Sequence, residues 1–245
     1  GWRHPLSLLQ PERAGILTVR LWRVALGALV GASLSVAGCV LQAVLRNPLA
    51  EPYVLGLSSG AGLGTALCIM AGGLALSALA LPAAGFFGAL ISMLIVYRLA
   101  RIGRGTAPHT LILSGVIWGS VCGSVLMFIV SQSSAEGLHA IMWWFLGDLQ
   151  VFDVRLVESV ALLSVLAFAG LLLISRHLNV LMLGEEMAGH VGLDPERTKG
   201  LVLGLSAVLT AAAVSASGLI SFVGLTVPPA TRALVGPDHR RLLPA

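Results

Sequence analysis

The feature that most constrains this chain is a set of long stretches that contain no charged side chain. The longest runs from Pro52 to Tyr97, and another of 22 residues lies between Arg23 and Arg46. At a rise of about 1.5 Å per residue, 22 helical residues span roughly 33 Å, which is enough to cross the hydrocarbon core of a bilayer. Because lipid offers no partners for backbone N–H and C=O groups, such segments form helices rather than open sheets. The pattern therefore predicts an all-α bundle of transmembrane helices.

Breaks within these stretches predict about seven spans. Gly72 and Pro82 interrupt the longest stretch, which is too long for one helix and is divided near residue 80. A second long stretch, 200–231, is divided before Gly218, and a short, broken segment follows. The predicted spans are 24–45, 52–80, 80–97, 110–135, 159–175, 200–217 and 218–235. We expect them to form one transmembrane domain over residues 1–245.

Composition excludes several other classes of protein. Only 11% of the residues are charged and 57% are hydrophobic, whereas a soluble domain carries about 25% charged residues. The chain therefore lacks the polar surface of a cytosolic enzyme, and it does not have the composition of a disordered region or a secreted disulfide module. The basic residues form no stripe, so nucleic acid is not an expected partner. Cys39, Cys68 and Cys122 lie in apolar runs without a CxxC pair, which predicts packing residues rather than metal ligands.

Small residues recur on one face of the first span. Gly27, Gly31, Ser35 and Gly38 are three or four residues apart. This spacing lets helices approach closely in lipid, so it predicts a tightly packed bundle.

The loops between seven alternating spans divide the basic residues unequally. One group of loops holds ten cations and the other holds five, and the positive-inside rule makes the first group cytoplasmic. We therefore expect an external segment at 1–19, an outer loop at 136–153 and a cytoplasmic loop at 176–199. The ten cations are Arg46, Arg98, Arg101, Arg104, Arg176, Arg197, Lys199, Arg232, Arg240 and Arg241, and the five are Arg3, Arg13, Arg20, Arg23 and Arg155.

The cytoplasmic loop 176–199 is unlike the rest of the chain because it is rich in charge. Its acidic residues are Glu185, Glu186, Asp194 and Glu196, and the segment 184–194 can form a short helix that ends near a glycine. Two interpretations stay open: an ordinary solvated loop, or a short helix presented to a cytoplasmic partner.

The segment after the first span is also informative. Pro48 and Pro52 end that span and force a turn. The glycine-rich run 56–64 that follows could cradle phosphate, but it lacks the lysine and the strand-to-helix context of a P-loop. We therefore do not expect this chain to be an ATPase.

Three segments of the chain carry long motifs: AGCVLQAVLRNPLAEPYVLGLSSGAGLG (37–64), GEEMAGHVGLD (184–194) and SGLISFVGLTVPPATRALVGPDHRRLLPA (217–245). They resemble, in this order, the signature, the coupling helix and the late conserved block of one known family, the iron-siderophore and vitamin B12 permeases of bacterial ABC importers. The resemblance covers the chain from about Arg20 to its last residue. It implies a type II ABC importer permease, which has ten helices. This chain would hold the second to the eighth, as a fragment or a shortened gene product. Pro229 stands where the family has histidine, which puts any role of that histidine in doubt here.

The resemblance also implies partners and a mechanism. They are a second permease subunit, two cytoplasmic ATPases and an external binding protein, with this chain in the bacterial cytoplasmic (inner) membrane. ATP-driven closure of the ATPases would move the loop at 184–194 and rock the helices between outward and inward states. ATP and Mg²⁺ would be held by the ATPases, so no cofactor is expected on this chain. The coupling residues would be Gly184, Glu185, Glu186, Met187, Ala188, Gly189, His190, Val191, Gly192 and Leu193.

Further site residues follow from the same resemblance. Arg20 and Arg23 match arginines that engage glutamates of the binding protein, the alternative being interfacial anchoring. Asn47 and Leu49 match residues that narrow the cytoplasmic end of the pathway, although Asn47 could simply cap its turn. The span 110–131 would line the path at the subunit interface, with Ser114, Ser120 and Ser124 as its polar candidates, although serines more often bond to their own helix.

The expected cargo is a ferric siderophore, with cobalamin, haem and other metal chelates as alternatives. No predicted span before the last holds a charged residue or a cluster of metal ligands, so the chelate would pass intact. An ion-coupled secondary transporter normally keeps an ionisable group in its membrane path, which makes that class a weaker alternative. A non-transporting remnant is the other alternative.

Overall fold

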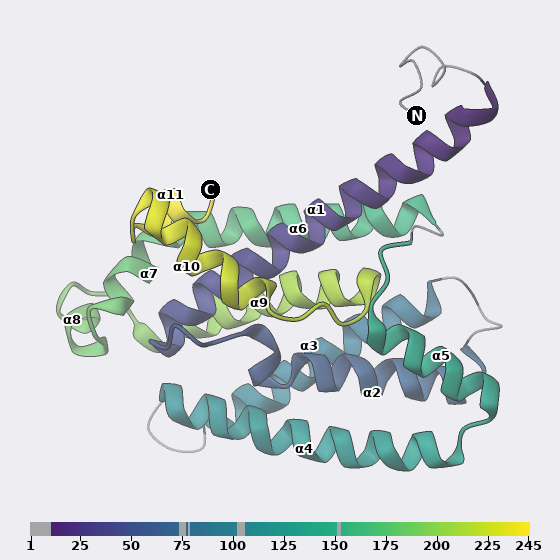
Figure 1. Ribbon diagram of the computed structural model, residues 1–245. Helices are drawn as coiled ribbons and strands as arrows, with labels where there is room; N and C mark the ends of the chain where they lie inside the picture. The colour runs from purple at the N-terminus through teal and green to yellow at the C-terminus, as the bar shows by residue number, and fades with distance from the viewer. Residues whose placement is uncertain (1–10, 74–76, 78, 102–105, 151–152) are drawn as a thin grey trace.

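The computed structural model describes residues 11–73, 77, 79–101, 106–150 and 153–245 (Figure 1). The predicted loop cations Arg3 and Arg104, and the first ten residues of the expected external segment, lie outside the described residues. Every regular element within them is helical. The elements are α1 (Pro11–Leu45), the 3-10 helix η2 (Pro52–Leu55), α2 (Leu57–Met70), α3 (Ala80–Ala100), α4 (Pro108–Gln132), α5 (Ala135–Leu146), α6 (Val154–Leu173), α7 (Ser175–Met182), α8 (Glu185–His190), α9 (Pro195–Ser217), α10 (Val223–Val235) and α11 (His239–Leu242).

Helix α9 lies at the centre of the bundle. It packs against α1 and α6 on one side and against α3 and α2 on the other (Figure 1). In its most apolar stretch 67% is buried, compared with 22% for α4, which lies at the periphery. Helices α1 and α9 contribute more buried side chains to the main core than any other elements, chiefly Leu, Val and Ala. The hydrophobic burial that holds the bundle together is therefore concentrated around α9.

The prediction of an all-α transmembrane bundle is confirmed. Among the described residues, five helices are long and apolar enough to cross a membrane, namely α1, α3, α4, α6 and α9. The remaining two predicted spans contain α2 and α10, which are shorter helices of 14 and 13 residues. The predicted breaks are also found, because Gly72 and Gly218 follow the ends of α2 and α9 with φ angles of 78° and 67°. Glycine tolerates this left-handed region because it has no Cβ.

Helix α5 corrects the prediction of an outer loop at 136–153. Its 12 residues are helical because Ser134 caps the first turn, with its hydroxyl accepting from the backbone N–H of Gly137 at 3.2 Å. Trp144 on this helix packs against the main core. Glu136 and His139 interrupt the apolar run in the sequence, which hides a helix that lies partly against the bundle.

Helix α10 shows how two adjacent prolines are accommodated. The sequence places Pro228 and Pro229 in a turn, but both lie inside the helix. Pro228 has no N–H to donate to the carbonyl of Gly224, four residues earlier. The side chain of Gln42 donates to that carbonyl instead, at 3.3 Å. A side chain of α1 therefore replaces the hydrogen bond that proline removes.

Helices α1 and α10 approach each other very closely at a pair of glycines. A methyl group at Gly38 would overlap backbone atoms of Gly224. The predicted tight packing is therefore found at Gly38, whereas nothing lies within 4 Å of a methyl group built at Gly31. Helices α2 and α3 meet in the same way, because a methyl group at Gly60 would overlap Gly88. The glycine-rich run 56–64 thus serves helix packing.

A buried histidine joins α7 to α11. The backbone N–H of His239 and its ring Nδ1 both contact Asn179 Oδ1, at 3.0 and 2.7 Å, and Asn179 Nδ2 donates to Asp238 Oδ1 at 2.7 Å. Because Asn179 Oδ1 is an acceptor, Nδ1 carries the proton and His239 is held as one neutral tautomer. Its side chain is fully buried, and burial, together with the nearby charge of Arg232, lowers its pKa to about 4 from 6.5. The charge of Asp238 opposes this shift.

This arrangement predicts a loss of stability in acid. The folded protein binds a proton at His239 more weakly than the unfolded chain does, so this contribution is complete above pH 6.5 and is lost as the pH falls towards 4. The loss is about 2–4 kcal/mol. Equilibrium unfolding in mixed micelles at pH 7 and pH 4.5 measures it, and His239→Gln should flatten this part of the pH dependence. An equal slope in both proteins would contradict the assignment.

Candidate functional site

Helix α8 is a short element held between two glycines. Gly184 and Gly192 flank it with φ angles of 129° and 80°, and a methyl group built at either meets no atom within 4 Å. Ala188 is fully buried and anchors the helix, whereas Met187 and Val191 are 52% and 67% exposed. The predicted short helix is therefore present, and it offers an apolar exposed edge. Its neighbours in the bundle are α7 and α9.

The single lysine of the chain lies buried beneath α8. Lys199 Nζ is 2.9 Å from Glu185 Oε1, 2.9 Å from Glu196 Oε1 and 2.8 Å from the backbone oxygen of Thr106. Its side chain is only 2% exposed. The carboxylate of Glu196 also accepts from the backbone N–H and the hydroxyl of Thr106, at 2.9 to 3.1 Å. One ammonium group thus holds together α8, the first turn of α9 and the connection that leads into α4.

Sequence reasoning counted Lys199 only as a loop cation and missed this role. Its position at the fifth residue of α9, next to an acidic segment, gives no sign of burial. The one available signal is that it is the only lysine among 15 basic residues. Glu185, predicted to act at the coupling helix, proves to bond inside the chain, while Glu186 is exposed.

The turn after α1 presents Leu49 to the surface. Asn47 Oδ1 accepts from the backbone N–H of Leu49 at 2.9 Å, so Asn47 does cap its turn. The Leu49 side chain is 73% exposed. Behind this turn, Glu51 Oε1 accepts at 2.7 Å from the backbone N–H of Phe222, the residue that precedes α10. The turn after α1 and the start of α10 are therefore fixed to each other.

The three predicted pathway serines of α4 do not share a face. Ser120 and Ser124 are exposed, and each donates to the carbonyl four residues before it, at 2.9 Å. Ser114 is 7% exposed and faces the bundle. Large apolar side chains surround the two exposed serines. They include Val116, Ile117, Val121, Val125 and Phe128, all more than 40% exposed.

The two predicted docking arginines differ in their surroundings. Arg20 and Arg23 are both exposed on α1. Arg23 Nη2 lies 3.5 Å from Asp148 Oδ1, in the connection after α5. The charge of Arg23 is therefore partly paired with a carboxylate of the same chain. Figure 1 shows this end of α1 at the opposite end of the bundle from α8.

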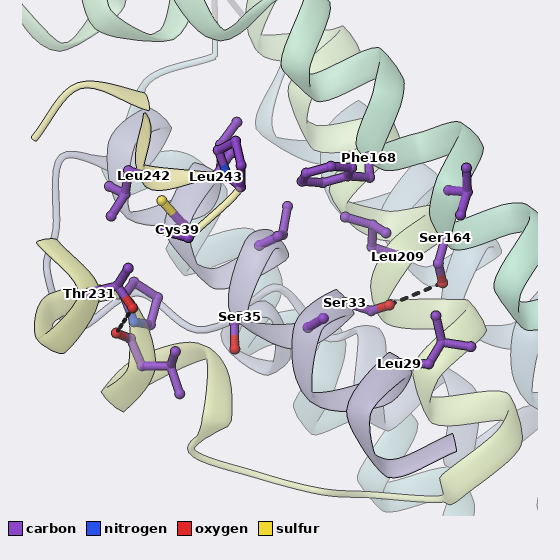
Figure 2. Close-up of a pocket in the computed structure, with 17 residues that line it drawn as sticks. Leu29, Ser33, Ser35, Cys39, Ser164, Phe168, Leu209, Thr231, Leu242 and Leu243 are labelled. Atoms are coloured by element: carbon purple, nitrogen blue, oxygen red, sulfur yellow. Dashed lines mark hydrogen bonds between the residues drawn. The ribbon is translucent and has the colours of Figure 1, made fainter. Parts of the chain in front are cut away.

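A pocket of about 430 Å³ lies between α1, α6, α10 and the C-terminal residues (Figure 2). None of the predicted site residues lines it. Its hydroxyl groups are already bonded, because Ser33 Oγ donates to Ser164 Oγ at 3.0 Å and Thr231 donates to its own helix at 3.1 Å. Phe168, Leu242 and other apolar side chains form most of its wall. Its chemistry suits an apolar group rather than a polar ligand.

Comparison with known proteins gives consistent matches over the whole chain. The model of the FecCD transport family matches residues 5–245. The cobalamin import system permease protein BtuC of Halobacterium salinarum is 44% identical over 246 residues, which cover 100% of this chain and 66% of the relative. The hemin transport system permease protein HmuU of Yersinia pestis is 38% identical, over 93% of this chain and 69% of the relative. This chain spans about two thirds of the length of these curated relatives.

A solved structure has the same arrangement of helices. It is an inward-facing conformation of a transporter described as of the metal-chelate ABC type. The two chains superpose with a TM-score of 0.87 at 30% sequence identity, over 96% of this chain and 75% of the other.

Proposed function

The chain belongs to the FecCD transport family, and we propose that it is a permease subunit of an ATP-driven importer of a bulky metal chelate. The resemblance seen in the sequence is thereby confirmed at the level of the family. The observation that carries the proposal furthest is the match of fold and sequence to a metal-chelate ABC transporter over nearly the whole chain. The bundle also presents two separate ends, with α8 at one and the beginning of α1, which carries the exposed Arg20 and Arg23, at the other (Figure 1).

The cargo in this proposal is a bulky chelate whose metal stays enclosed. The printed names of the relatives mention cobalamin, hemin and iron chelatin. These compounds share a large organic frame around a coordinated metal. A ferric siderophore, expected from the sequence, and cobalamin, imported by the relative with 44% identity, are the two cargoes to test first. Neither a non-transporting remnant nor an ion-coupled transporter is favoured by these relatives.

Helix α8 is the proposed contact with a cytoplasmic ATPase. Its exposed apolar side chains, Met187 and Val191, lie beside the exposed Glu186 and His190. This mixture of an apolar patch and charges suits a protein interface rather than lipid. The residues from Gly184 to Leu193 would enter the ATPase, which would bind and hydrolyse ATP with Mg²⁺.

Helix α4 is the proposed face for a second permease subunit. It is the least buried of the five long helices, with 22% of its apolar window buried. Its exposed face carries Ser120 and Ser124 within an apolar surface. Such a face can meet a second copy and leave hydroxyl groups along a path between the subunits. Leu49, on the turn after α1, would narrow the path, with Asn47 holding its turn, and the subunits would alternate between outward and inward states.

The outer end of α1 is the proposed docking site of a binding protein. We expect Arg20→Glu to lower the association rate of that protein about tenfold at low salt, because charge pairs act mainly on encounter. Arg23→Glu should have a smaller effect, since Asp148 already neutralises part of its charge. Association measured by biolayer interferometry on complexes in nanodiscs tests this, with the exposed Arg155→Glu as control. Equal effects of Arg20→Glu and Arg155→Glu would contradict a specific docking role.

Uptake by cells tests the proposed function as a whole. Cells with and without this gene, supplied with the partner ATPase and binding protein, are compared for uptake of radiolabelled cyanocobalamin, haemin and ferrichrome. We expect gene-dependent uptake of one of these. Equal uptake of all three by both strains, with the protein present in the membrane, would overturn the proposal for this cargo class.

A further inference from the structure

Lys199 lies where three segments that are distant in the sequence meet. Its ammonium group contacts Glu185 of α8, Glu196 of α9 and the backbone of Thr106, which is fully buried two residues before α4 begins. Each contact is between 2.8 and 2.9 Å. Hydrogen bonds that carry charge are about twice as strong as neutral ones. These charged hydrogen bonds therefore connect α8 strongly to the bundle. Few other side chains of α8 are buried against it.

Helix α8 itself is built to move as a small unit. Glycines with positive φ and open space around them flank it on both sides, and Ala188 is its one fully buried side chain. An external force on α8 would therefore turn it about these glycines unless another contact resisted. Besides the packing of Ala188, the ion pair of Lys199 with Glu185 ties α8 to the bundle.

We propose that Lys199 is a positioning residue that transmits displacement of α8 to α4 and α9. The inference rests on the proposed function, in which α8 contacts the ATPase and α4 lines the path. Removing a buried ammonium from one of its carboxylates is unfavourable, so the three segments move together rather than separate. Motion of α8 then reaches α9, the central helix, and through Thr106 the start of α4.

The test uses the complex of the full gene product with its ATPase and binding protein in lipid nanodiscs. The measured quantity is the stimulation ratio, the rate of ATP hydrolysis with binding protein divided by the rate without it. This ratio reports communication across the permease and does not require the cargo to be known. Two variants interrupt the cluster. Lys199→Met removes its central charge, and Glu196→Gln removes the charge of the carboxylate that binds Thr106, just before α4. The exposed neighbour Arg197→Met is the matched control, since Arg197 pairs only with Asp194 in the same turn among the described residues.

We expect the stimulation ratio to fall about threefold or more in Lys199→Met and Glu196→Gln, and to stay at the wild-type value in Arg197→Met. If Lys199→Met does not fold, Glu196→Gln decides, because it leaves the ion pair with Glu185 in place. A wild-type ratio in assembled Glu196→Gln complexes would overturn the inference, and so would an equal fall in the control. A wild-type complex that does not assemble with the ATPase, or that the binding protein does not stimulate, would instead contradict the proposed function.

Discussion

Replacing Lys199 with methionine is expected to lower the free energy of unfolding by about 2–4 kcal/mol. The substitution keeps an unbranched side chain, shorter by the terminal nitrogen, and removes the charge that Glu185, Glu196 and the Thr106 carbonyl share. Both carboxylates are 31–41% exposed, so water can reach part of each. Thr106 is fully buried, so water cannot replace the hydrogen bond that its carbonyl accepts from Lys199.

Equilibrium unfolding in mixed detergent micelles, followed by circular dichroism, measures this loss. The control is Arg197→Met, two residues away, whose side chain is 86% exposed and lies 3.0 Å from Asp194. Exposed pairs of this kind contribute about 0–1 kcal/mol. A Lys199→Met protein as stable as the control would show that the buried cluster does not hold these segments together.

The second large effect is expected at Gly38. A methyl group there would overlap backbone atoms of Gly224, and backbone cannot turn away as a flexible side chain can. Helices α1 and α10 must therefore separate, which would weaken the bond from Gln42 to the Gly224 carbonyl. We expect Gly38→Ala to destabilise the protein by about 1–3 kcal/mol or more.

The matched control for this prediction is Gly31→Ala, on the same helix. A methyl group at Gly31 meets no atom within 4 Å, and alanine favours a helix over glycine by about 1 kcal/mol. The same unfolding measurement should therefore find Gly31→Ala as stable as the wild type or more stable. Equal destabilisation by both substitutions would contradict the assignment of the loss to the contact of α1 with α10 at Gly38, since Gly31 makes no such contact.

The sequence allowed the fold class to be predicted because charge-free length is a direct consequence of the bilayer. Helices α1, α3, α4, α6 and α9 each contain most of one predicted span, although α1 and α9 begin earlier, at Pro11 and Pro195, within segments expected to be loops. Gly72 and Gly218 mark real ends of helices. Helix α5 was missed because Glu136 and His139 break its apolar run. The donor that replaces the missing N–H of Pro228 is Gln42, more than 180 residues away in the sequence, which no local pattern reveals.

The candidate site was predictable only in part. The short helix α8 follows from a local signal, an acidic start and a terminal glycine, and it was found where expected. The burial of Lys199 depends on Thr106, 93 residues away, and the partner of Arg23 lies 125 residues away. Ser114 differs from Ser120 in exposure because the bundle covers one face of α4. Such pairings are set by how helices pack, and the sequence of one segment does not contain them.

The most direct test of ATP-driven import is accumulation of cargo in proteoliposomes. The full gene product, its ATPase and its binding protein are reconstituted. Uptake of labelled cyanocobalamin, haemin and ferrichrome is then measured with and without ATP on the side of the membrane that the ATPase faces. We predict that one cargo accumulates only with ATP, and that ionophores leave its uptake unchanged. Accumulation driven by an ion gradient without ATP, or no accumulation of any of the three, would contradict the account.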